Sequence, residues 1–182
     1  RLLARVSECC AKPRCGSPVD LAPWALSVMA PGGTAIVPLP PRGSHEGNLL
    51  PVGGVVLWAY TDMADPRWTW GSRYVMLRQP ADAAGPQKAG FTATDGWAAY
   101  ARRSHLFVKR FTLVEGAAYP DLGSAVEVFA NAEMLELETL GPLVRLAPGE
   151  AVEHAERWSL FRDVPAIRSE ADVDAHVLPP LA

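Results

Sequence analysis

The chain has 182 residues, enough for one domain with a sizeable core, and its 17 Lys and Arg against 20 Asp and Glu give a net charge of −3. This balance excludes a basic nucleic-acid-binding domain, and 49% hydrophobic with 20% charged residues excludes a disordered chain. There are 17 prolines and 15 glycines, where average usage would give about 22 of the two together. A helical bundle is excluded, because an interior proline destabilises a helix by about 3 kcal/mol.

The ends and apolar runs of the chain bear on its location. No apolar run reaches the roughly 18 residues of a membrane span, and the charged start from Arg1 to Arg5 lacks the apolar core of a signal peptide. We therefore expect a cytoplasmic protein with neither nucleic acid nor membrane as a partner. Because the first residue is not Met, we also expect the chain to begin part-way into a gene product, whose front end could carry a targeting signal.

All three cysteines, Cys9, Cys10 and Cys15, lie close together near the start of the chain. An odd, clustered set is a poor disulfide framework, and the nearest histidine, His45, completes no metal-ligand spacing. We expect no metal and no cofactor. The basic residues of 1–18 contrast with the acidic remainder, so we expect this segment to be poorly ordered.

The predicted elements in chain order are mostly short strands between Pro-rich and Gly-rich turns. Apolar, β-branched and aromatic runs predict strands over residues 19–29, 34–39, 55–60, 74–78, 87–91, 96–100 and 105–111. Residues 61–70 are predicted to form a long loop that is anchored by its aromatic side chains. In the strand 105–111, side chains of His105, Phe107, Lys109 and Phe111 are expected on one face.

Residues 124–140 are rich in helix formers, yet their apolar residues alternate with period two. No clean helical stripe appears, so we predict two strands joined near Asn131. A last strand is predicted over 150–161, and Ser169 to Asp172 has the pattern of a capping box that begins a short helix. The fold class is therefore all-β, an antiparallel β-sandwich over 19–165 with a C-terminal tail and short helix over 166–182.

Two segments in the C-terminal half of the chain together resemble a known protein family. Leu135-Glu-Leu-Glu-Thr139 is followed by Leu146-Ala-Pro-Gly-Glu150 and then by His154, Trp158 and Phe161. Over these 27 residues the chain resembles the C-terminal end of aldose 1-epimerases, the galactose mutarotases. In that family the Leu-x-Leu-Glu-Thr strand carries the catalytic Glu, which falls on Glu138.

The stretch from Leu21 to Phe161 also resembles an uncharacterised bacterial branch of the galactose mutarotase-like set. The recurring segments include Leu21-Ala-Pro-Trp-Ala-Leu26, Asp65-Pro-Arg-Trp68, Pro86-Gln-Lys88 and Phe107-Val-Lys-Arg-Phe111. The resemblance implies a large antiparallel sandwich with a sugar-sized groove on its concave sheet. Because members of that set are longer, we expect this chain to lack N-terminal strands.

The chemistry implied is anomer interconversion, which needs a base for the anomeric hydroxyl proton and an acid for the ring oxygen. The resemblance gives Glu138 the role of base, and Glu136 should share its face. The acid in that family is a His, but the matching segment here has Pro23 before Trp24 and no His. We therefore expect His105 or Lys109 to replace it.

Further residues are predicted to contact the sugar. Trp58, Trp68, Trp70 and Trp97 are candidates for stacking on a sugar ring, although for each single Trp a place in the core is the favoured interpretation. Trp68 and Trp70 are the better candidates, because they lie on a predicted loop. The remaining predicted contacts are Glu127, Glu136, Arg73 and Lys88.

Two hypotheses stay open: an aldose 1-epimerase-type isomerase acting on a sugar or sugar phosphate, and a non-catalytic sugar-binding or structural module that has lost the His. Exposed sheet edges would offer a route to a homo-oligomer.

Overall fold

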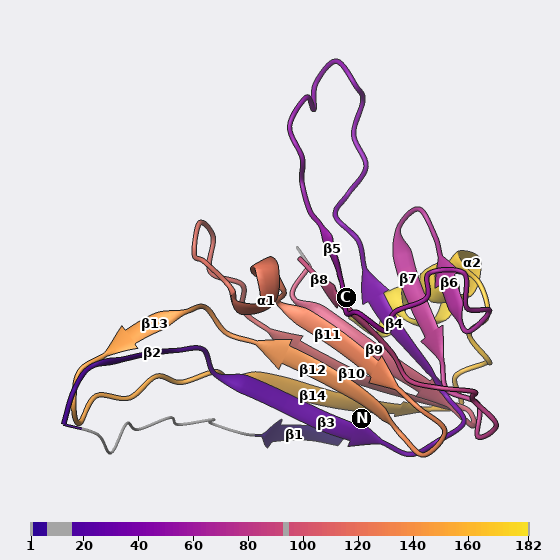
Figure 1. The fold of residues 1–182 in the computed structure, drawn as a ribbon. Helices are drawn as coiled ribbons and strands as arrows, with labels where there is room; N and C mark the ends of the chain where they lie inside the picture. Colours follow the sequence, from indigo (N-terminus) through magenta and orange to yellow (C-terminus); the bar gives the residue numbers. More distant parts are fainter. Residues whose placement is uncertain (1, 7–15, 93–94, 182) are drawn as a thin grey trace.

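The computed structural model describes residues 2–6, 16–92 and 95–181 (Figure 1). The predicted all-β sandwich is confirmed, with 40% strand and 9% helix. Within the described residues the strands form two main antiparallel sheets, one of seven strands and one of five, and a separate two-stranded ribbon.

The seven-stranded sheet has the order β1-β14-β10-β9-β4-β7-β6. Its strands are β1 Leu2–Val6, β4 Thr34–Pro38, β6 Trp68–Trp70, β7 Tyr74–Arg78, β9 Trp97–Arg102, β10 His105–Phe111 and β14 Glu156–Arg162. The five-stranded sheet has the order β3-β12-β11-β8-β5. Its strands are β3 Trp24–Met29, β5 Val55–Leu57, β8 Gln87–Phe91, β11 Val126–Ala130 and β12 Leu135–Leu140. The ribbon pairs β2 Val19–Leu21 with β13 Val144–Leu146.

The main core lies between the two sheets, because each strand turns alternate side chains inward. The five-stranded sheet contributes Val126, Val128, Leu135, Leu137 and Phe91, and the seven-stranded sheet contributes Ala35, Val37, Val75, Leu77 and Tyr100. These side chains are almost fully buried.

A second core covers the other face of the seven-stranded sheet. Ile36, Met76, Leu106 and Val108 point to that side. The C-terminal segment packs against them through Val164, Ile167, Val173 and Val177. This segment carries α2 (Glu170–His176) and α3 (Leu178–Leu181), and Ser169 and Asp172 form the predicted capping box at the start of α2. A short turn, α1 (Pro120–Gly123), precedes β11.

Most of the predicted strands are present. The strands 74–78, 87–91 and 105–111 have the predicted bounds, and residues 124–140 form two strands rather than a helix. The predicted strand 19–29 is instead split into β2 and β3 beside Pro23, which has no N–H to donate to a ladder. Residues 61–70, predicted as a loop, contain β6, and the last strand begins at Glu156 rather than at residue 150.

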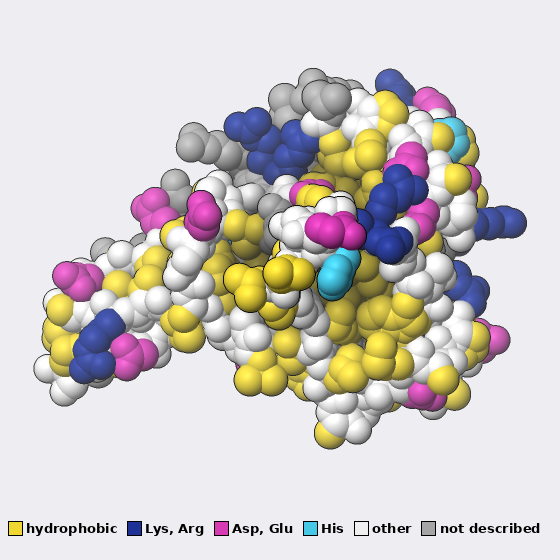
Figure 2. All heavy atoms as spheres, turned by 90° about the horizontal axis from the view of Figure 1, so that it is seen from above, with side chains coloured by type: hydrophobic (Ala, Val, Ile, Leu, Met, Phe, Trp, Pro, Cys, Tyr) yellow, Lys and Arg dark blue, Asp and Glu magenta, His cyan; other side chains and the backbone are white. Residues whose placement is uncertain are grey.

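A long loop between β4 and β5 projects away from the sandwich (Figure 1). It exposes Leu49, Leu50 and Val52, which are 74%, 80% and 60% accessible. Seen from above, hydrophobic side chains gather around the base of this loop (Figure 2).

The start of the chain is described only over Leu2–Val6, which pairs as β1 with β14. The expectations for Cys9, Cys10 and Cys15 lie outside the described residues, as does most of the segment 1–18. Among the described helices, none has the length and apolar character needed to cross a membrane.

Candidate functional site

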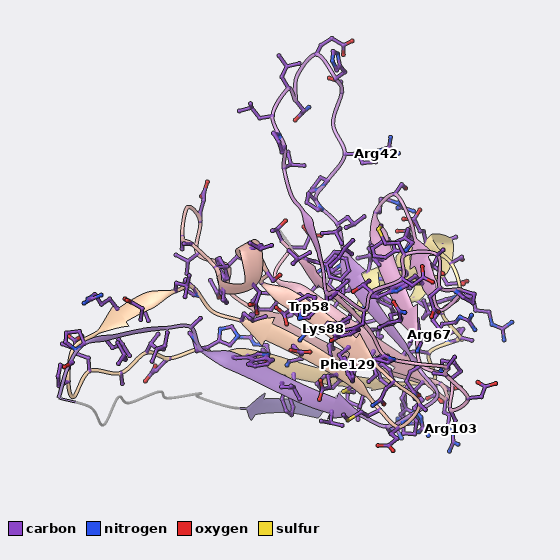
Figure 3. All side chains as sticks on the ribbon, in the orientation of Figure 1. Arg42, Trp58, Arg67, Lys88, Arg103 and Phe129 are labelled. Carbon is purple, nitrogen blue, oxygen red and sulfur yellow. The ribbon has the colours of Figure 1, made fainter. Side chains whose placement is uncertain are left out.

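The outer face of the five-stranded sheet carries an unusual group of polar side chains. Val126, Val128, Leu135 and Leu137 point into the core, so Glu127, Glu136 and Glu138 point outward by the period-two alternation of strands. Glu127 of β11 and Glu138 of β12 are directly opposite each other in the antiparallel register. Lys88 of β8 lies on the same face, opposite Phe129 (Figure 3).

Lys88, Glu127 and Glu138 form what we call the carboxylate cluster. The ammonium Nζ of Lys88 lies 2.7 Å from Oε2 of Glu127 and 3.2 Å from each carboxylate oxygen of Glu138. The indole Nε1 of Trp24 donates a hydrogen bond of 2.9 Å to Oε2 of Glu138. One lysine therefore holds two facing carboxyl groups that would otherwise repel each other.

Aromatic rings surround the cluster. The Lys88 ammonium lies 4.7 Å from the ring centroid of Trp58 and 5.3 Å from that of Trp24, within cation–π range. Gly90, opposite Glu127, makes room for this arrangement, because a Cβ there would lie 3.4 Å from Trp58 and 2.1 Å from Oγ of Ser124.

The ionisable groups of the cluster differ in how the surroundings shift their pKa values. Burial raises the pKa of Glu127 to about 7; Lys88 opposes this shift, while the charge of Glu138 and the side chain of Asp121 add to it. Burial alone would lower the pKa of Lys88, but the hydrogen bond to Glu127 and the two negative charges raise it overall. Near neutral pH the cluster thus combines a fixed cation with one carboxyl group poised to gain or lose a proton.

The two carboxylates are shielded from solvent. Glu127 and Glu138 are both 0% exposed and Lys88 is 8% exposed, whereas Trp24 is 51% and Tyr60 is 44% exposed. Oε1 of Glu127 is buried without a hydrogen-bond donor among the described residues. The outer surface offered to a ligand is therefore aromatic, with Lys88 as the polar group that separates it from the carboxylates.

Glu136 shares this face, as predicted from its spacing to Glu138. Its carboxyl group is partly buried, and burial together with the charge of Glu138 raises its pKa. Burial raises the pKa of the Tyr60 hydroxyl, and the negative charges of Glu138, Glu127 and Glu136 add to this rise. The positive charge of Lys88 opposes it. Glu136 and Tyr60 thus belong to the same electrostatic neighbourhood as the cluster.

Lys109, predicted as a replacement acid, lies on the inner side of this sheet. Its ammonium donates to the carbonyl oxygens of Ala25 and Leu137 at 3.0 and 3.1 Å and pairs with Glu156 at 2.7 Å. Burial lowers the pKa of Lys109, although the charge of Glu156 opposes this. Lys109 therefore supports the sheet from behind and does not reach the outer face where the carboxylate cluster lies.

Thr139, His154 and Trp158 complete a buried polar group around Glu156. Thr139 donates to Glu156 and lies 2.9 Å from Nε2 of His154, and Nε1 of Trp158 donates to Glu156 at 2.7 Å. Burial lowers the pKa of His154.

The other predicted site residues lie elsewhere. His105 is exposed at the start of β10, with Nδ1 bonded to the carbonyl of Arg103. Arg73 pairs with Asp174 of α2 at 2.6 Å. Trp68 and Trp70 stack on each other at 4.8 Å, and Nε1 of Trp68 donates to Gln87. The structure brings Glu138, Glu127, Glu136 and Lys88 together and leaves these four residues outside the cluster.

A cavity of about 820 Å³ lies further along the sheet, between the 113–119 loop and Val52. Its wall includes Gly123 and Ala125 but, among the described residues, no member of the carboxylate cluster. The described residues also contain no group of three or more His, Cys, Asp and Glu side chains that could hold a metal ion. The chemistry of this face therefore depends on the cluster and its aromatic surroundings.

In comparisons with known proteins, no family model, curated protein or solved structure gives a significant match to this chain.

Two neighbours of the cluster, Trp24 and Tyr60, are not among the site residues predicted from the sequence. Trp24 follows from the pairing of β3 with β12, because it lies two residues from Leu26, the residue opposite Glu138, and so shares the face of Glu138. Tyr60 lies two residues after Trp58 in the predicted strand 55–60, so alternation places the two on one face, although β5 itself ends at Leu57.

Proposed function

We propose that the protein binds a sugar on the outer face of the five-stranded sheet and promotes the interconversion of its anomers. The observation that carries the proposal is the pair of facing carboxyl groups, Glu127 and Glu138, held by Lys88 beneath exposed aromatic side chains. Aromatic rings offer apolar surfaces on which the CH faces of a sugar pack, and adjacent charged groups can bind its hydroxyls. The resemblance of residues 135–161 to aldose 1-epimerases, with Glu138 in the position of the base, supports the same assignment.

The reaction would proceed by paired proton transfers. Glu138 accepts the proton of the anomeric hydroxyl, and protonated Glu127 donates its proton to the ring oxygen. The bond between the anomeric carbon and the ring oxygen breaks, which gives the open-chain aldehyde. Rotation and the reverse transfers close the ring as the other anomer and restore both carboxyl groups. The raised pKa of Glu127, about 7, suits this role because a general acid works best when its pKa is near the working pH.

Binding without catalysis is the second candidate, and one observation favours it. Both carboxyl groups are 0% exposed, so a sugar meets them only if the Lys88 side chain moves aside. If Lys88 stays in place, the aromatic surface and Glu136 would hold a sugar while the carboxylates serve only to fix Lys88.

The test combines binding and exchange measurements on the same variants. Titration calorimetry with common aldoses measures binding, and polarimetry or NMR exchange measures anomer interconversion. Glu138→Gln should abolish the catalysed rate, and Glu127→Gln should reduce it strongly. Glu153→Gln, an exposed carboxylate outside the cluster, is the matched control and should keep the wild-type rate.

The outcomes separate the two candidates. Sugar binding with equal exchange rates in wild type and Glu138→Gln would leave a binding module and remove the isomerase. Absence of binding for every aldose tested would overturn the assignment of this face to sugars.

A further inference from the structure

A separate cavity of about 330 Å³ lies at the turn between β9 and β10. Four arginines line it: Arg78 from the end of β7, Arg102 from the end of β9, Arg103 from the turn, and Arg168 just before α2. None of the described residues that line it is acidic. In a chain whose net charge is −3, this is a local concentration of positive charge in a concave site.

Two of the guanidinium groups are oriented by backbone carbonyl oxygens. Nη2 of Arg78 donates to the carbonyl of Pro66 at 2.8 Å, and Nε of Arg102 donates to the carbonyl of Pro31 at 2.6 Å. A carbonyl oxygen fixes the direction of a guanidinium group but carries no opposing charge, and several N–H donors remain on each.

The other two arginines use only their backbone groups in hydrogen bonds within the described part of the chain. The guanidinium groups of Arg103 and Arg168 make no hydrogen bond or ion pair there. The nearby Asp172 directs Oδ2 to the N–H groups of Arg168 and Ser169 and to the Ser169 hydroxyl, as part of the capping box of α2. The described lining of the cavity therefore holds four arginines and no carboxylate; Arg78 also interacts with the charge of Asp65, which lies outside the lining. Such a concentration of positive charge attracts an anion.

The turn that forms one wall has an unfavourable sequence for its shape. Arg103 and Ser104 have φ angles of 46° and 61°, both in the left-handed region. Two-residue hairpin turns of this shape favour Asn-Gly, because those residues tolerate a positive φ. The Arg103-Ser104 sequence makes this turn less stable than Asn-Gly would, but it places a guanidinium group at the cavity. Backbone strain of this kind is often found at binding sites.

We propose that this cavity binds the phosphoryl group of a small phosphorylated molecule. Guanidinium groups match phosphate oxygens in paired hydrogen bonds, and several of them suit a dianion better than a single carboxylate. The volume fits a small ligand, whereas a nucleic-acid backbone needs an extended basic surface. Arg103 lies far from Lys88 and Trp58 (Figure 3), so the site is distinct from the carboxylate cluster and does not depend on the proposed sugar chemistry.

The test uses the intact chain with inorganic phosphate and inorganic pyrophosphate as probes, by titration calorimetry at ionic strength held constant with chloride. The key variant is Arg103→Asn with Ser104→Gly, which removes one guanidinium group while giving the turn its preferred sequence. It should fold at least as stably as wild type, so a loss of binding cannot be attributed to unfolding. We expect saturable one-to-one binding by wild type and at least about tenfold weaker binding by the variant.

Two further variants complete the design. Arg168→Gln, in the segment just before α2, should weaken binding similarly, and Arg42→Gln, an exposed arginine on the projecting loop, should leave it unchanged. No saturable binding by wild type, or equal affinity in the turn variant, would overturn the proposal. It would also fail if a single-stranded oligonucleotide bound more tightly than pyrophosphate and lost that affinity in the turn variant, because the surface would then be one for nucleic acid.

Discussion

At the scale of single residues, Lys88 decides the character of the outer face. A buried carboxylate without a partner is strongly unfavourable, and here two face each other across adjacent strands. Lys88 offsets their repulsion with a single ammonium group between them. Glu127 makes the weaker fit, because Lys88 is its only cationic contact among the described residues, whereas Glu138 receives the Trp24 indole N–H in addition to Lys88. This asymmetry explains why the proton is expected on Glu127.

The raised pKa of Glu127 predicts how stability depends on pH. Below the usual value of 4.5, Glu127 is protonated in both the folded and the unfolded state. Between 4.5 and about 7, the unfolded chain releases this proton while the folded protein retains it, so folding stability falls as pH rises. Above about 7 both states are ionised and the loss is complete.

Glu127→Gln removes this dependence. In thermal unfolding scans, the melting temperature of wild type should fall relative to that of Glu127→Gln as pH rises from 5 to 7. Glu153→Gln should follow wild type throughout. A constant difference between wild type and Glu127→Gln across this range would contradict the assignment of the proton to Glu127.

Gly90 tests whether the surroundings of the cluster are tightly packed. A Cβ at this position would meet Oγ of Ser124 at 2.1 Å and approach the Trp58 ring at 3.4 Å. Gly90→Ala should therefore lower the free energy of unfolding by about 1–3 kcal/mol, as overpacking of a closed site does. Urea denaturation measures the change. The control is Gly54→Ala, where no atom lies within 4 Å of the added Cβ, and a loss equal to that of Gly90→Ala would show that packing is not the cause.

At the scale of elements, the buried ion pair of Lys109 and Glu156 ties the two sheets together. Lys109 extends from β10 of the seven-stranded sheet to carbonyl oxygens of β3 and β12 in the five-stranded sheet. Both side chains are almost fully buried, at 0% and 1% exposure. Removing one partner leaves an uncompensated charge inside the sandwich.

Lys109→Met should therefore lower the free energy of unfolding by about 3–5 kcal/mol, and the double variant Lys109→Met with Glu156→Gln should recover much of that loss. Chemical denaturation of the four proteins in this double-mutant cycle measures the coupling. The exposed pair of Arg145 and Asp20 is the contrast, since Arg145→Met should change stability by no more than about 1 kcal/mol. Additive losses from Lys109 and Glu156 would show that the two buried side chains do not stabilise each other.

The strands themselves were largely predictable, and the exceptions have local causes. Period-two alternation identified Val126-Glu127-Val128 and Leu135-Glu136-Leu137 as strands despite their helix formers, because burial on one face outweighs intrinsic propensity. Strand β6 was missed because only three residues, Trp68–Trp70, pair at the sheet edge. Alternation also placed Glu136 beside Glu138. It could not reveal that Lys109 and Glu138 are on opposite sides of one sheet, because that depends on how the two sheets face each other.

At the scale of the whole molecule, the C-terminal segment is a third layer of the fold. The sequence indicated only a tail with a short helix over 166–182. In the structure, Val164, Ile167, Val173 and Val177 close the second core over the outer face of the seven-stranded sheet. Without this layer Ile36, Met76, Leu106 and Val108 would form an exposed apolar surface.

The C-terminal segment should contribute measurably to the stability of the fold through Ile167. Ile167 is only 5% exposed and Leu160, on the seven-stranded sheet itself, is 42% exposed. If the C-terminal segment is part of the cooperative fold, Ile167→Ala should lower the free energy of unfolding by about 2–5 kcal/mol, because it removes buried methyl groups and leaves a cavity. Leu160→Ala should lower it far less, since much of that side chain is already in water. Urea denaturation followed by tryptophan fluorescence compares the two, and similar small losses would mean that the segment lies against the sheet without stabilising it.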